Sequence, residues 1–331
     1  MLPTDAYESA ARVLREAEQI SLACHVNPDA DALGSMLGLG LHLRGMGKKV
    51  IAASPNRLDD LPRWVDVLPG RELLVAPAEF PKQPSVAVTL DAADMERLDG
   101  LGPSISRAST SICVDHHRTN EGFGTLNLVD PEAAATAVVV YRLLERLGGE
   151  IDAATAACLY AGILTDTGRF QFESASPEVL RIAADLRDRP FDHVALGQAL
   201  YADASVGYLH LLGTVLPRVQ HVPEADLVWT FVNRDDLERA ETASQDTDDL
   251  IDLVRSAREA DVAAVLKEQV GGGYKVSMRS RGDTDVAAIA EAFGGGGHRL
   301  AAGYTSKASL EETRDALLDA LIQVNPATAA P

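Results

Sequence analysis

The sequence has little cysteine, few aromatic residues and no long apolar run. Only three cysteines occur in 331 residues, and none forms a CxxC pair, so we expect free thiols in a reducing compartment rather than disulfides or a thiolate metal site. No apolar stretch approaches the roughly 20 residues that a membrane-spanning helix needs. Residues 1–9 also lack the basic and apolar segments of a signal peptide. We therefore expect a cytoplasmic protein with no membrane partner.

Positive charge is also scarce. Lysine and arginine total 30 against 49 aspartates and glutamates, which gives a formal net charge of −19. Such a surface repels phosphate polymers, whose binding depends on many basic contacts, so we expect no long nucleic acid as partner. A small phosphorylated ligand is still compatible with this charge, because bound metal ions and a few arginines can reverse the field inside one cleft. The length fits two domains, each with its own core.

The most informative stretch is HVNPDAD, residues 25–31. It follows an apolar run over 20–24, predicted as a buried strand, and precedes a helical pattern that starts at Met36. Imidazole and carboxylate groups suit a divalent ion such as Mn²⁺ or Mg²⁺. The alternation of Asp29 and Asp31 predicts that the two carboxylates point toward two neighbouring sites.

Other candidate ligands also follow apolar runs. They are Asp91 after 86–90, the trio Asp115, His116 and His117 after 111–114, and Asp166 after 152–164. The alternation of strand and helix patterns predicts a parallel sheet covered by helices, and ligands of such sheets gather at the carboxyl ends of the strands. We therefore expect these side chains to converge with those of residues 25–31.

A second, smaller α/β domain is predicted after Pro223. Helical spacing is predicted over 4–18, 131–147, most of 177–216, 235–240 and 248–257, and strands over 227–232, 262–270 and 274–279. Four glycines at 294–297 precede His298 and Arg299, a pattern that favours a phosphate-recognising loop over a flexible hinge. Arg279 and Arg281 could belong to the same basic patch or could be solvated surface residues.

The assembled motifs resemble the DHH/DHHA1 phosphoesterase family, and within it the bacterial nano-RNases and 3′-phosphoadenosine-5′-phosphate (pAp) phosphatases. The resemblance covers nearly the whole chain. It is carried by residues 25–35, by Asp91 with Asp94 and Arg97, by Asp115-His116-His117, by 162–168 and by 294–303. It implies an α/β fold with a DHH domain over 1–190, built on a mainly parallel sheet flanked by helices. A helical connector over 191–222 and a DHHA1 domain over 223–325 would follow, with the active-site cleft between the domains.

The resemblance also implies a site with two Mn²⁺ ions, or alternatively Mg²⁺. One ion would be held by His25, Asp29 and Asp91, and the other by Asp31, Asp91, His116 and Asp166, with Asp91 bridging. His117 would act on the substrate phosphate as donor or general acid, and Asp115 would orient a histidine. The implied substrate contacts are Gly296, Gly297, His298, Arg299 and Arg279.

The implied activity is hydrolysis of short oligoribonucleotides (nanoRNA), including linear dinucleotides such as pApA and pGpG, to mononucleotides, and of pAp to AMP. Family relatives suggest a homodimer. The alternatives are a cyclic di-AMP phosphodiesterase, a manganese inorganic pyrophosphatase and a catalytically inactive nucleotide sensor. The His298-Arg299 loop argues against a pyrophosphatase, and the presence of a residue at every expected ligand position argues against a sensor.

Overall fold

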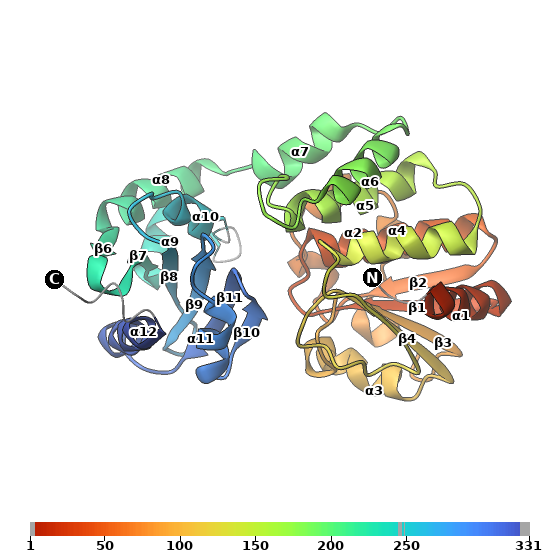
Figure 1. Cartoon of the computed structure of the whole chain (residues 1–331), viewed down its shortest axis with the longest axis horizontal. Coiled ribbons are helices and arrows are strands. Elements are labelled where there is room, and N and C mark those ends of the chain that lie inside the picture. The colour runs from red at the N-terminus through yellow and green to blue at the C-terminus, as the bar shows by residue number, and fades with distance from the viewer. Residues whose placement is uncertain (1–3, 244–246, 248, 325–331) are drawn as a thin grey trace. The chain divides into compact units, whose positions relative to one another are not determined.

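The computed structural model describes residues 4–243, 247 and 249–324, and the chain divides into two compact units, 1–202 and 203–331 (Figure 1). Each unit contains one β-sheet. The predicted helix start at 248 and the predicted domain end at 325 lie outside the described residues. The predicted domain bounds at 190 and 223 stay predictions.

The first unit is built on a five-stranded sheet in the order β2-β1-β3-β4-β5, with every pair of neighbours parallel. The strands are β1 (Gln19–Cys24), β2 (Lys49–Ala53), β3 (Val86–Leu90), β4 (Thr110–Asp115) and β5 (Leu126–Val129). The predicted parallel sheet is confirmed. The short strand β5 was not predicted, because its four residues carry no strong apolar pattern.

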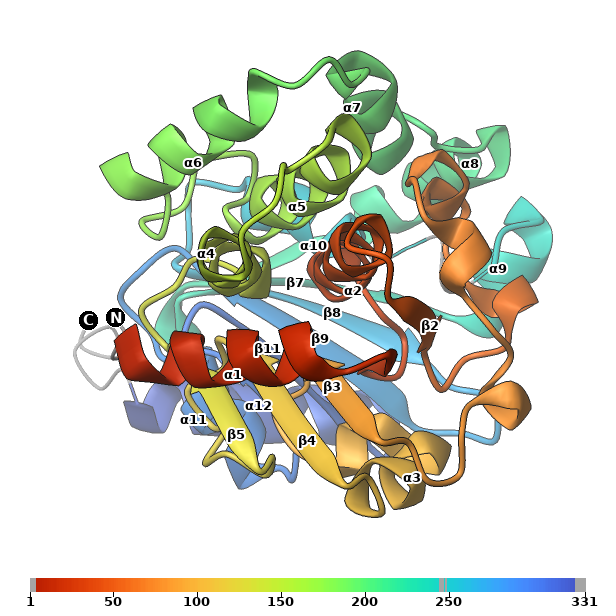
Figure 2. The same cartoon turned by 90° about the vertical axis from the view of Figure 1, so that its right-hand side faces the viewer.

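Helices cover both faces of this sheet. They are α1 (Thr4–Glu16), α2 (Ala30–Gly45), α3 (Gly102–Ser106), α4 (Thr136–Leu147), α5 (Ala153–Asp166), α6 (Pro177–Arg187) and α7 (His193–Tyr201). Helices α2 and α4 lie on one face and α3 lies on the other (Figure 2). Alternate strand residues therefore enter different cores: Leu22 packs in the cluster that includes α2 and α4, and Ala23 in the cluster that includes α3. Between β2 and β3 the chain forms short 3₁₀ turns within 58–79.

The strand order positions the site. From β1 the chain moves to β2 on one side, and then crosses back to β3 on the other side of β1. The connections that leave β1 and β3 thus diverge, and in open α/β sheets this switch point is where ligands bind. Residues 25–31 follow β1 and Asp91 follows β3. The two strongest predicted motifs therefore lie at the switch point.

Two predicted helix starts were wrong. Helix α2 begins at Ala30 rather than Met36, because the Asp29 side chain caps it by accepting the N–H groups of Asp31 and Ala32. Helix α4 begins at Thr136 rather than residue 131. Residues 131–135 form a turn. The helix starts at Thr136, where its first N–H groups donate to the distant carboxylate of Asp31.

The second unit contains a six-stranded sheet in the order β10-β11-β9-β8-β7-β6, antiparallel except for the pair β7–β8. Its strands are β6 (Gln220–Val222), β7 (Leu227–Val232), β8 (Val262–Glu268), β9 (Tyr274–Ser280), β10 (Gly296–His298) and β11 (Ala301–Ser306). Its helices are α8 (Val206–Val215), α9 (Arg234–Ala240), α10 (Leu250–Arg255), α11 (Val286–Ala292) and α12 (Leu310–Val324). The predicted α/β character is confirmed; α11 and α12 were not predicted.

This second sheet is also covered on both faces. Trp229 and Ala264 pack in the cluster that contains α11 and α12, whereas Val228 and Ala263 pack in the cluster that contains α8 and α10. The alternation follows from the two-residue period of a strand. Among the described residues of the whole chain, no helix is long and apolar enough to cross a bilayer.

Candidate metal centre

His25, Asp29 and Asp91 form the first group of candidate ligands. Their ligand atoms lie within 4.8 Å of one another. His25 Nε2 is 3.5 Å from Asp91 Oδ2 and 3.9 Å from Asp29 Oδ2, while His25 Nδ1 lies 2.8 Å from the Val26 carbonyl oxygen. When Nδ1–H donates to this carbonyl, Nε2 is the nitrogen that faces the two carboxylates and that an ion could bind, as in metal-binding histidines.

Asp31, Asp91, His116 and Asp166 form the second group. His116 Nε2 lies 3.2 Å from Asp166 Oδ2, 3.6 Å from Asp91 Oδ1 and 3.8 Å from Asp31 Oδ2. The other nitrogen, Nδ1, lies 3.2 Å from the Ala133 carbonyl oxygen. The two histidines thus have the same arrangement, with one nitrogen against the main chain and the other among carboxylates.

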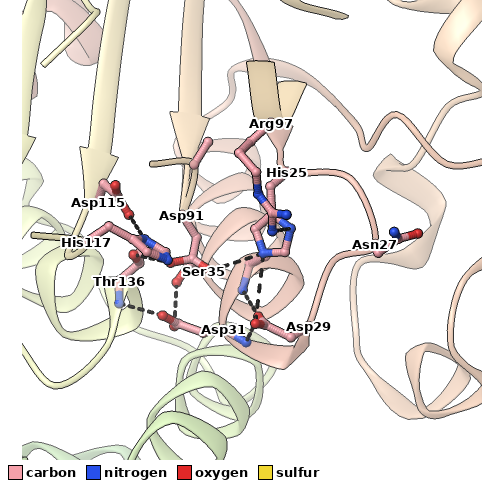
Figure 3. A network of polar contacts seen from close by, with 12 residues as sticks. His25, Asn27, Asp29, Asp31, Ser35, Asp91, Arg97, Asp115, His117 and Thr136 are labelled. Carbon is pink, nitrogen blue, oxygen red and sulfur yellow. Dashed lines mark hydrogen bonds and ion pairs between the residues drawn. The ribbon is translucent and has the colours of Figure 1, made fainter. Parts of the chain in front are cut away.

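Asp91 belongs to both groups, and its two oxygens face different histidines. Oδ2 faces His25, and Oδ1 faces His116 (Figure 3 shows Asp91 among its labelled neighbours). The residue is 2% exposed and has a left-handed backbone, with φ of 58°. Non-glycine residues seldom adopt this conformation, and strained residues concentrate at functional sites. The geometry permits one carboxylate to be shared by two ions.

Hydrogen bonds determine which carboxylate oxygens remain for an ion. Asp31 is fully buried: its Oδ1 accepts from Ser35 Oγ at 3.1 Å and from Ala137 N at 2.9 Å, and its Oδ2 accepts from Thr136 N at 2.6 Å. A carboxylate has about four acceptor sites. The remaining one is on Oδ2, the oxygen that faces His116. In Asp29, likewise, Oδ1 caps α2 and Oδ2 faces His25.

The two aspartates of the Asp29-Ala30-Asp31 motif therefore belong to different groups, but not for the predicted reason. The alternation argument applies to an extended strand, whereas Asp29 is the N-cap of α2 and Asp31 lies in its first turn. The helical rotation between these two positions separates the carboxylates. Asp29 stays exposed and Asp31 is buried.

Asp166 reaches the site because α5 packs closely against α2. A Cβ atom at Gly162 would lie 2.5 Å from Asp31 Oδ1, and one at Gly34 would lie 2.4 Å from the Cys158 carbonyl oxygen. Asp166 is four residues after Gly162 and so lies on the same face of α5. The missing side chain at Gly162 lets this face approach Asp31 and His116.

The protonation equilibria reflect crowded negative charge. Burial and the charges of Asp166 and Asp91 raise the pKa of Asp31 well above its usual range, and burial raises that of Asp166 to about 6 despite its bond to His116. Burial would lower the pKa of His25, but Asp91 and Asp29 outweigh it and raise that pKa to about 9. Burial alone would raise the pKa of Asp91, but the three neighbouring histidines hold it well below its usual range.

The donor set fits divalent cations. Carboxylate oxygens in these numbers suit hard ions, and two imidazole nitrogens add the borderline character that Mn²⁺ accepts. A cation also relieves the repulsion that raises the carboxylate pKa values. The described residues of the first unit therefore contain what a divalent-metal centre requires.

His117 and Asp115 form a pair beside this centre. His117 Nδ1 lies 2.7 Å from Asp115 Oδ1, and the other oxygen, Asp115 Oδ2, accepts from Asn120 Nδ2 at 2.7 Å. Asp115 is fully buried, and its two oxygens contact His117 and Asn120. The geometry permits the predicted role of Asp115 as the residue that orients His117. Burial would lower the pKa of His117, but the bond to Asp115 and the charge of Asp91 raise it.

Two residues that organise the centre were not predicted. Thr136 donates its hydroxyl to Asp91 Oδ1 at 2.8 Å, and Asn120 holds Asp115. A single threonine before the apolar run 137–140 and an asparagine three residues after His117 are weak signals in a sequence. Arg97, which was part of the predicted second motif, places Nη2 3.1 Å from His25 Nδ1 (Figure 3).

The predicted substrate contacts of the second unit lie on the edge strand β10, directly after it, and on β9. The predicted glycine loop is partly strand β10, which pairs with β11 so that His298 is opposite Ala301, and Ala301 is in turn opposite Arg279 of β9. Directly opposed residues share one face of a sheet. His298 and Arg279 therefore flank the small side chain of Ala301. The Arg279 Nε lies 3.7 Å from Asp252 Oδ1, and Arg299 donates to the Gly282 carbonyl oxygen at 2.7 Å.

The packing on β11 requires two of the three glycines at 295–297, but not the third. A Cβ at Gly295 would lie 2.2 Å from the Gly303 carbonyl oxygen, and one at Gly297 would lie 2.5 Å from that of Ala301, so both are required by packing on β11. A Cβ at Gly296 would meet no heavy atom of the described residues within 4 Å. Packing on β11 therefore does not require glycine at position 296. A ligand that approaches the main chain there would require it.

The fold and the site together define the class of α/β proteins that bind divalent metal ions. Comparison with known proteins agrees with this class. Residues 19–163 match the model of the DHH family, N-terminal domain, and residues 229–325 match that of the DHHA1 domain. The chain is 37% identical over 94% of its length, and 92% of the relative's, to the bifunctional oligoribonuclease and PAP phosphatase NrnA of Thermus thermophilus. The chain belongs to the DHH family.

Two other similarities extend over most of the chain. The protein of the same name from Bacillus subtilis is 27% identical, with 72% of this chain and 74% of the relative covered. The crystal structure of an exopolyphosphatase-related protein from Bacteroides fragilis superposes with a TM-score of 0.89 at 25% identity, covering 99% of this chain and 98% of that one. The predicted α/β fold with a DHH and a DHHA1 domain is therefore confirmed.

Proposed function

We propose that this protein is a two-metal phosphoesterase that hydrolyses short oligoribonucleotides and linear dinucleotides such as pApA and pGpG to mononucleotides, and pAp to AMP. The observation that carries the proposal is the position of Asp91, whose two oxygens face His25 and His116 in two separate ligand groups. The activities named for the Thermus and Bacillus relatives, oligoribonuclease and PAP phosphatase, support the substrate class.

In the proposed site His25, Asp29 and Asp91 hold one ion, and Asp31, Asp91, His116 and Asp166 hold the other. The ions are Mn²⁺, with Mg²⁺ as the alternative that the same oxygen-rich donors accept. When bound, the pair supplies an activated water and neutralises charge on the phosphate. The protein contributes fixed geometry, because main-chain and hydroxyl donors hold the carboxylates of Asp29, Asp31 and Asp91 in place.

His117 is the proposed donor to the scissile phosphate. Its Nδ1 is committed to Asp115, so a substrate oxygen would contact Nε2. The bond to Asp115 and the charge of Asp91 raise the pKa of His117, so the protonated ring is more populated than in a free histidine. A protonated imidazole can stabilise the negative charge on the phosphate or pass a proton to the leaving oxygen.

Residues of the second unit are the proposed contacts for a terminal phosphate. His298 and Arg279 supply donors on either side of Ala301, and Gly296 allows the main chain to approach the ligand. Arg299 is exposed and adds positive charge next to His298. Recognition of one terminal phosphate restricts the enzyme to short substrates, which agrees with a protein of net charge −19.

Product analysis tests this proposal. Full-length protein loaded with Mn²⁺ is incubated separately with 5′-pApA, pAp, cyclic di-AMP, pyrophosphate and a long single-stranded RNA. Rapid formation of AMP from the first two, with slow or no cleavage of long RNA, supports the proposal. Preference for cyclic di-AMP or pyrophosphate replaces it with the corresponding activity. Turnover of none of them indicates a nucleotide sensor.

We further propose that the protein acts in the cytoplasm as a homodimer. The three cysteines are free and buried, which suits a reducing compartment. Sedimentation equilibrium of the full chain measures the oligomeric state, and a monomer at micromolar concentration contradicts the dimer.

A further inference from the structure

We propose that Thr136, at the start of α4, is a positioning residue for the shared carboxylate Asp91, and that the first turn of α4 is part of the metal centre. This inference rests on the two-ion site proposed above. None of the predicted ligands lies on α4, and Thr136 itself would bind no ion.

The first turn of α4 has an unusual cap. The N-cap residue is Ala135, which has no polar side chain, so the first N–H groups of the helix need acceptors from elsewhere. Asp31, which is 105 residues away in the sequence, accepts the N–H groups of Thr136 and Ala137. A buried carboxylate at a helix N-terminus is also stabilised by the helix dipole. The helix start and the ligand Asp31 therefore hold each other in place.

The hydroxyl of Thr136 adds a second bond from the same residue to a different ligand. Oγ1 donates to Asp91 Oδ1 at 2.8 Å, while the main-chain N–H of Thr136 is 2.6 Å from Asp31 Oδ2 (Figure 3). Thr136 is fully buried, so water does not compete for these bonds. One residue thus fixes the positions of two candidate ligands of the second ion.

Orientation matters most for Asp91. The terminal torsion of an aspartate has a broad energy minimum, so the side chain itself does not determine where each oxygen points. The Thr136 hydroxyl takes one acceptor site of Oδ1 and leaves the other directed toward His116, while Oδ2 faces His25. Loss of this bond would let the carboxylate rotate and would misplace one of the two oxygens that the ions share.

Substitutions can separate the hydroxyl from the rest of the residue. Thr136→Val keeps the branched shape and the main-chain bond to Asp31 but removes Oγ1, whereas Thr136→Ser keeps Oγ1 and removes the methyl group. Thr155→Val is a matched control. Thr155 is fully buried in the first turn of α5, and its hydroxyl has no hydrogen-bond partner among the described residues.

The test is calorimetric titration of metal-stripped, full-length protein with Mn²⁺. We expect Thr136→Val to bind at least one ion about 10- to 100-fold more weakly than wild type, the usual effect of losing a partner that orients a metal ligand. Thr136→Ser and Thr155→Val should bind as wild type does. Unchanged affinity in Thr136→Val, or a serine variant as weak as the valine variant, overturns the proposal.

Thermal unfolding distinguishes positioning from a purely structural role. If Thr136 only stabilised the fold, Thr136→Val would lower Tm in EDTA but keep the full rise in Tm on adding Mn²⁺, and this outcome also overturns the proposal. A positioning role predicts a reduced rise at subsaturating Mn²⁺. If the valine variant does not fold, Thr136→Ala is compared with Thr136→Ser in the same way.

The titration also separates this inference from the proposed function. If wild-type protein binds Mn²⁺ but does not hydrolyse pApA or pAp, the proposed function is wrong. The metal titrations of the Thr136 variants can still be interpreted in that case. Wild-type protein that binds no Mn²⁺ overturns both.

Discussion

The two units present charge in opposite ways. In the first, Asp31 and Asp91 are almost completely buried, and hydroxyl and main-chain donors fix their oxygens. In the second, Arg299 is exposed next to an edge strand, and His298 and Arg279 are partly exposed. Buried, fixed anions suit ions that take part in chemistry, whereas exposed cations suit a ligand that binds and leaves. Substitutions in the first unit should thus affect kcat or metal binding, and those in the second should affect KM.

The largest effect is expected for Asp91→Asn, which removes the charge shared by both ligand groups. Loss of an ion removes several kcal/mol of transition-state stabilisation, so hydrolysis of pApA should fall by about 1,000-fold or more. Mn²⁺ titration should show weaker binding at both sites. Glu145→Gln, on the exposed side of α4, is the control. Binding lost at one site only would contradict the bridging role.

His117→Gln should separate catalysis from metal binding within the first unit. Because His117 is bonded to Asp115 and is not a proposed ligand, kcat should fall by about 100- to 10,000-fold while Mn²⁺ affinity is retained. His116→Gln should instead weaken Mn²⁺ binding. The exposed His221→Gln serves as control. Equal loss of metal in both active-site variants would show that His117 is a ligand.

Arg299→Ala tests the second unit. If its guanidinium binds a terminal phosphate, KM for pApA should rise by about 10- to 100-fold, the range for a lost hydrogen bond to a charged group, with kcat little changed. Hydrolysis of bis(p-nitrophenyl) phosphate, which has no terminal phosphate, should be unaffected. Arg258→Ala, another exposed arginine, is the control. An unchanged KM would remove Arg299 from the substrate site.

Gly162→Ala tests the close packing that brings Asp166 to the first unit's site. The new methyl group would lie 2.5 Å from Asp31 Oδ1, so we expect a loss of about 1–3 kcal/mol in the free energy of unfolding and weaker Mn²⁺ binding. Urea unfolding in EDTA and calorimetry measure the two effects. Gly197→Ala is in α7, where no atom of the described part of the chain lies within 4 Å of the added methyl, and should instead be neutral or stabilising. Normal metal binding in Gly162→Ala would show that the site tolerates displacement of Asp31.

The smallest effect is expected for Asp261→Asn, which changes the stability of the second unit. Asp261 is a buried carboxylate that is not a proposed metal ligand. Asp261 accepts from Ser280 Oγ and from the N–H groups of Arg281 and Thr284. Burial would raise its pKa, but hydrogen bonds from Thr284, Asp283 and Ser280 outweigh burial and lower it. Its contribution to stability is therefore complete above the unfolded pKa of about 4 and is lost as pH falls through the folded pKa. Asp261→Asn should cost about 1–3 kcal/mol at pH 7 and much less at low pH.

Fluorescence can follow this change in the second unit alone. The chain has two tryptophans, and Trp64→Phe leaves Trp229 of β7 as the only reporter. Urea unfolding at pH 7 and pH 3 gives the difference, with the exposed Asp319→Asn as control. A destabilisation that does not change with pH would mean that the shape of Asp261, not its charge, matters.

Local sequence determined much of this protein. Apolar runs marked the strands, and β3 and β7 have the predicted bounds, 86–90 and 227–232, because short buried strands need consecutive apolar residues wherever the rest of the chain lies. Polar residues directly after such strands indicated the sheet edge where His25, Asp91 and His116 meet. The candidate ligands could be identified from the sequence because histidine and aspartate are residue types that bind divalent ions.

Tertiary structure decided the rest. The start of α4 depends on Asp31, and the orientation of Asp91 depends on Thr136, contacts that span 105 and 45 residues. Local patterns contain no information on such pairs, so they predicted the start of α4 five residues too early and gave no role to Thr136. The Asp29 cap likewise placed Asp31 in a helix instead of an extended turn. Hydrogen-bond partners across the fold, rather than local propensity, determine which oxygens remain for the ions.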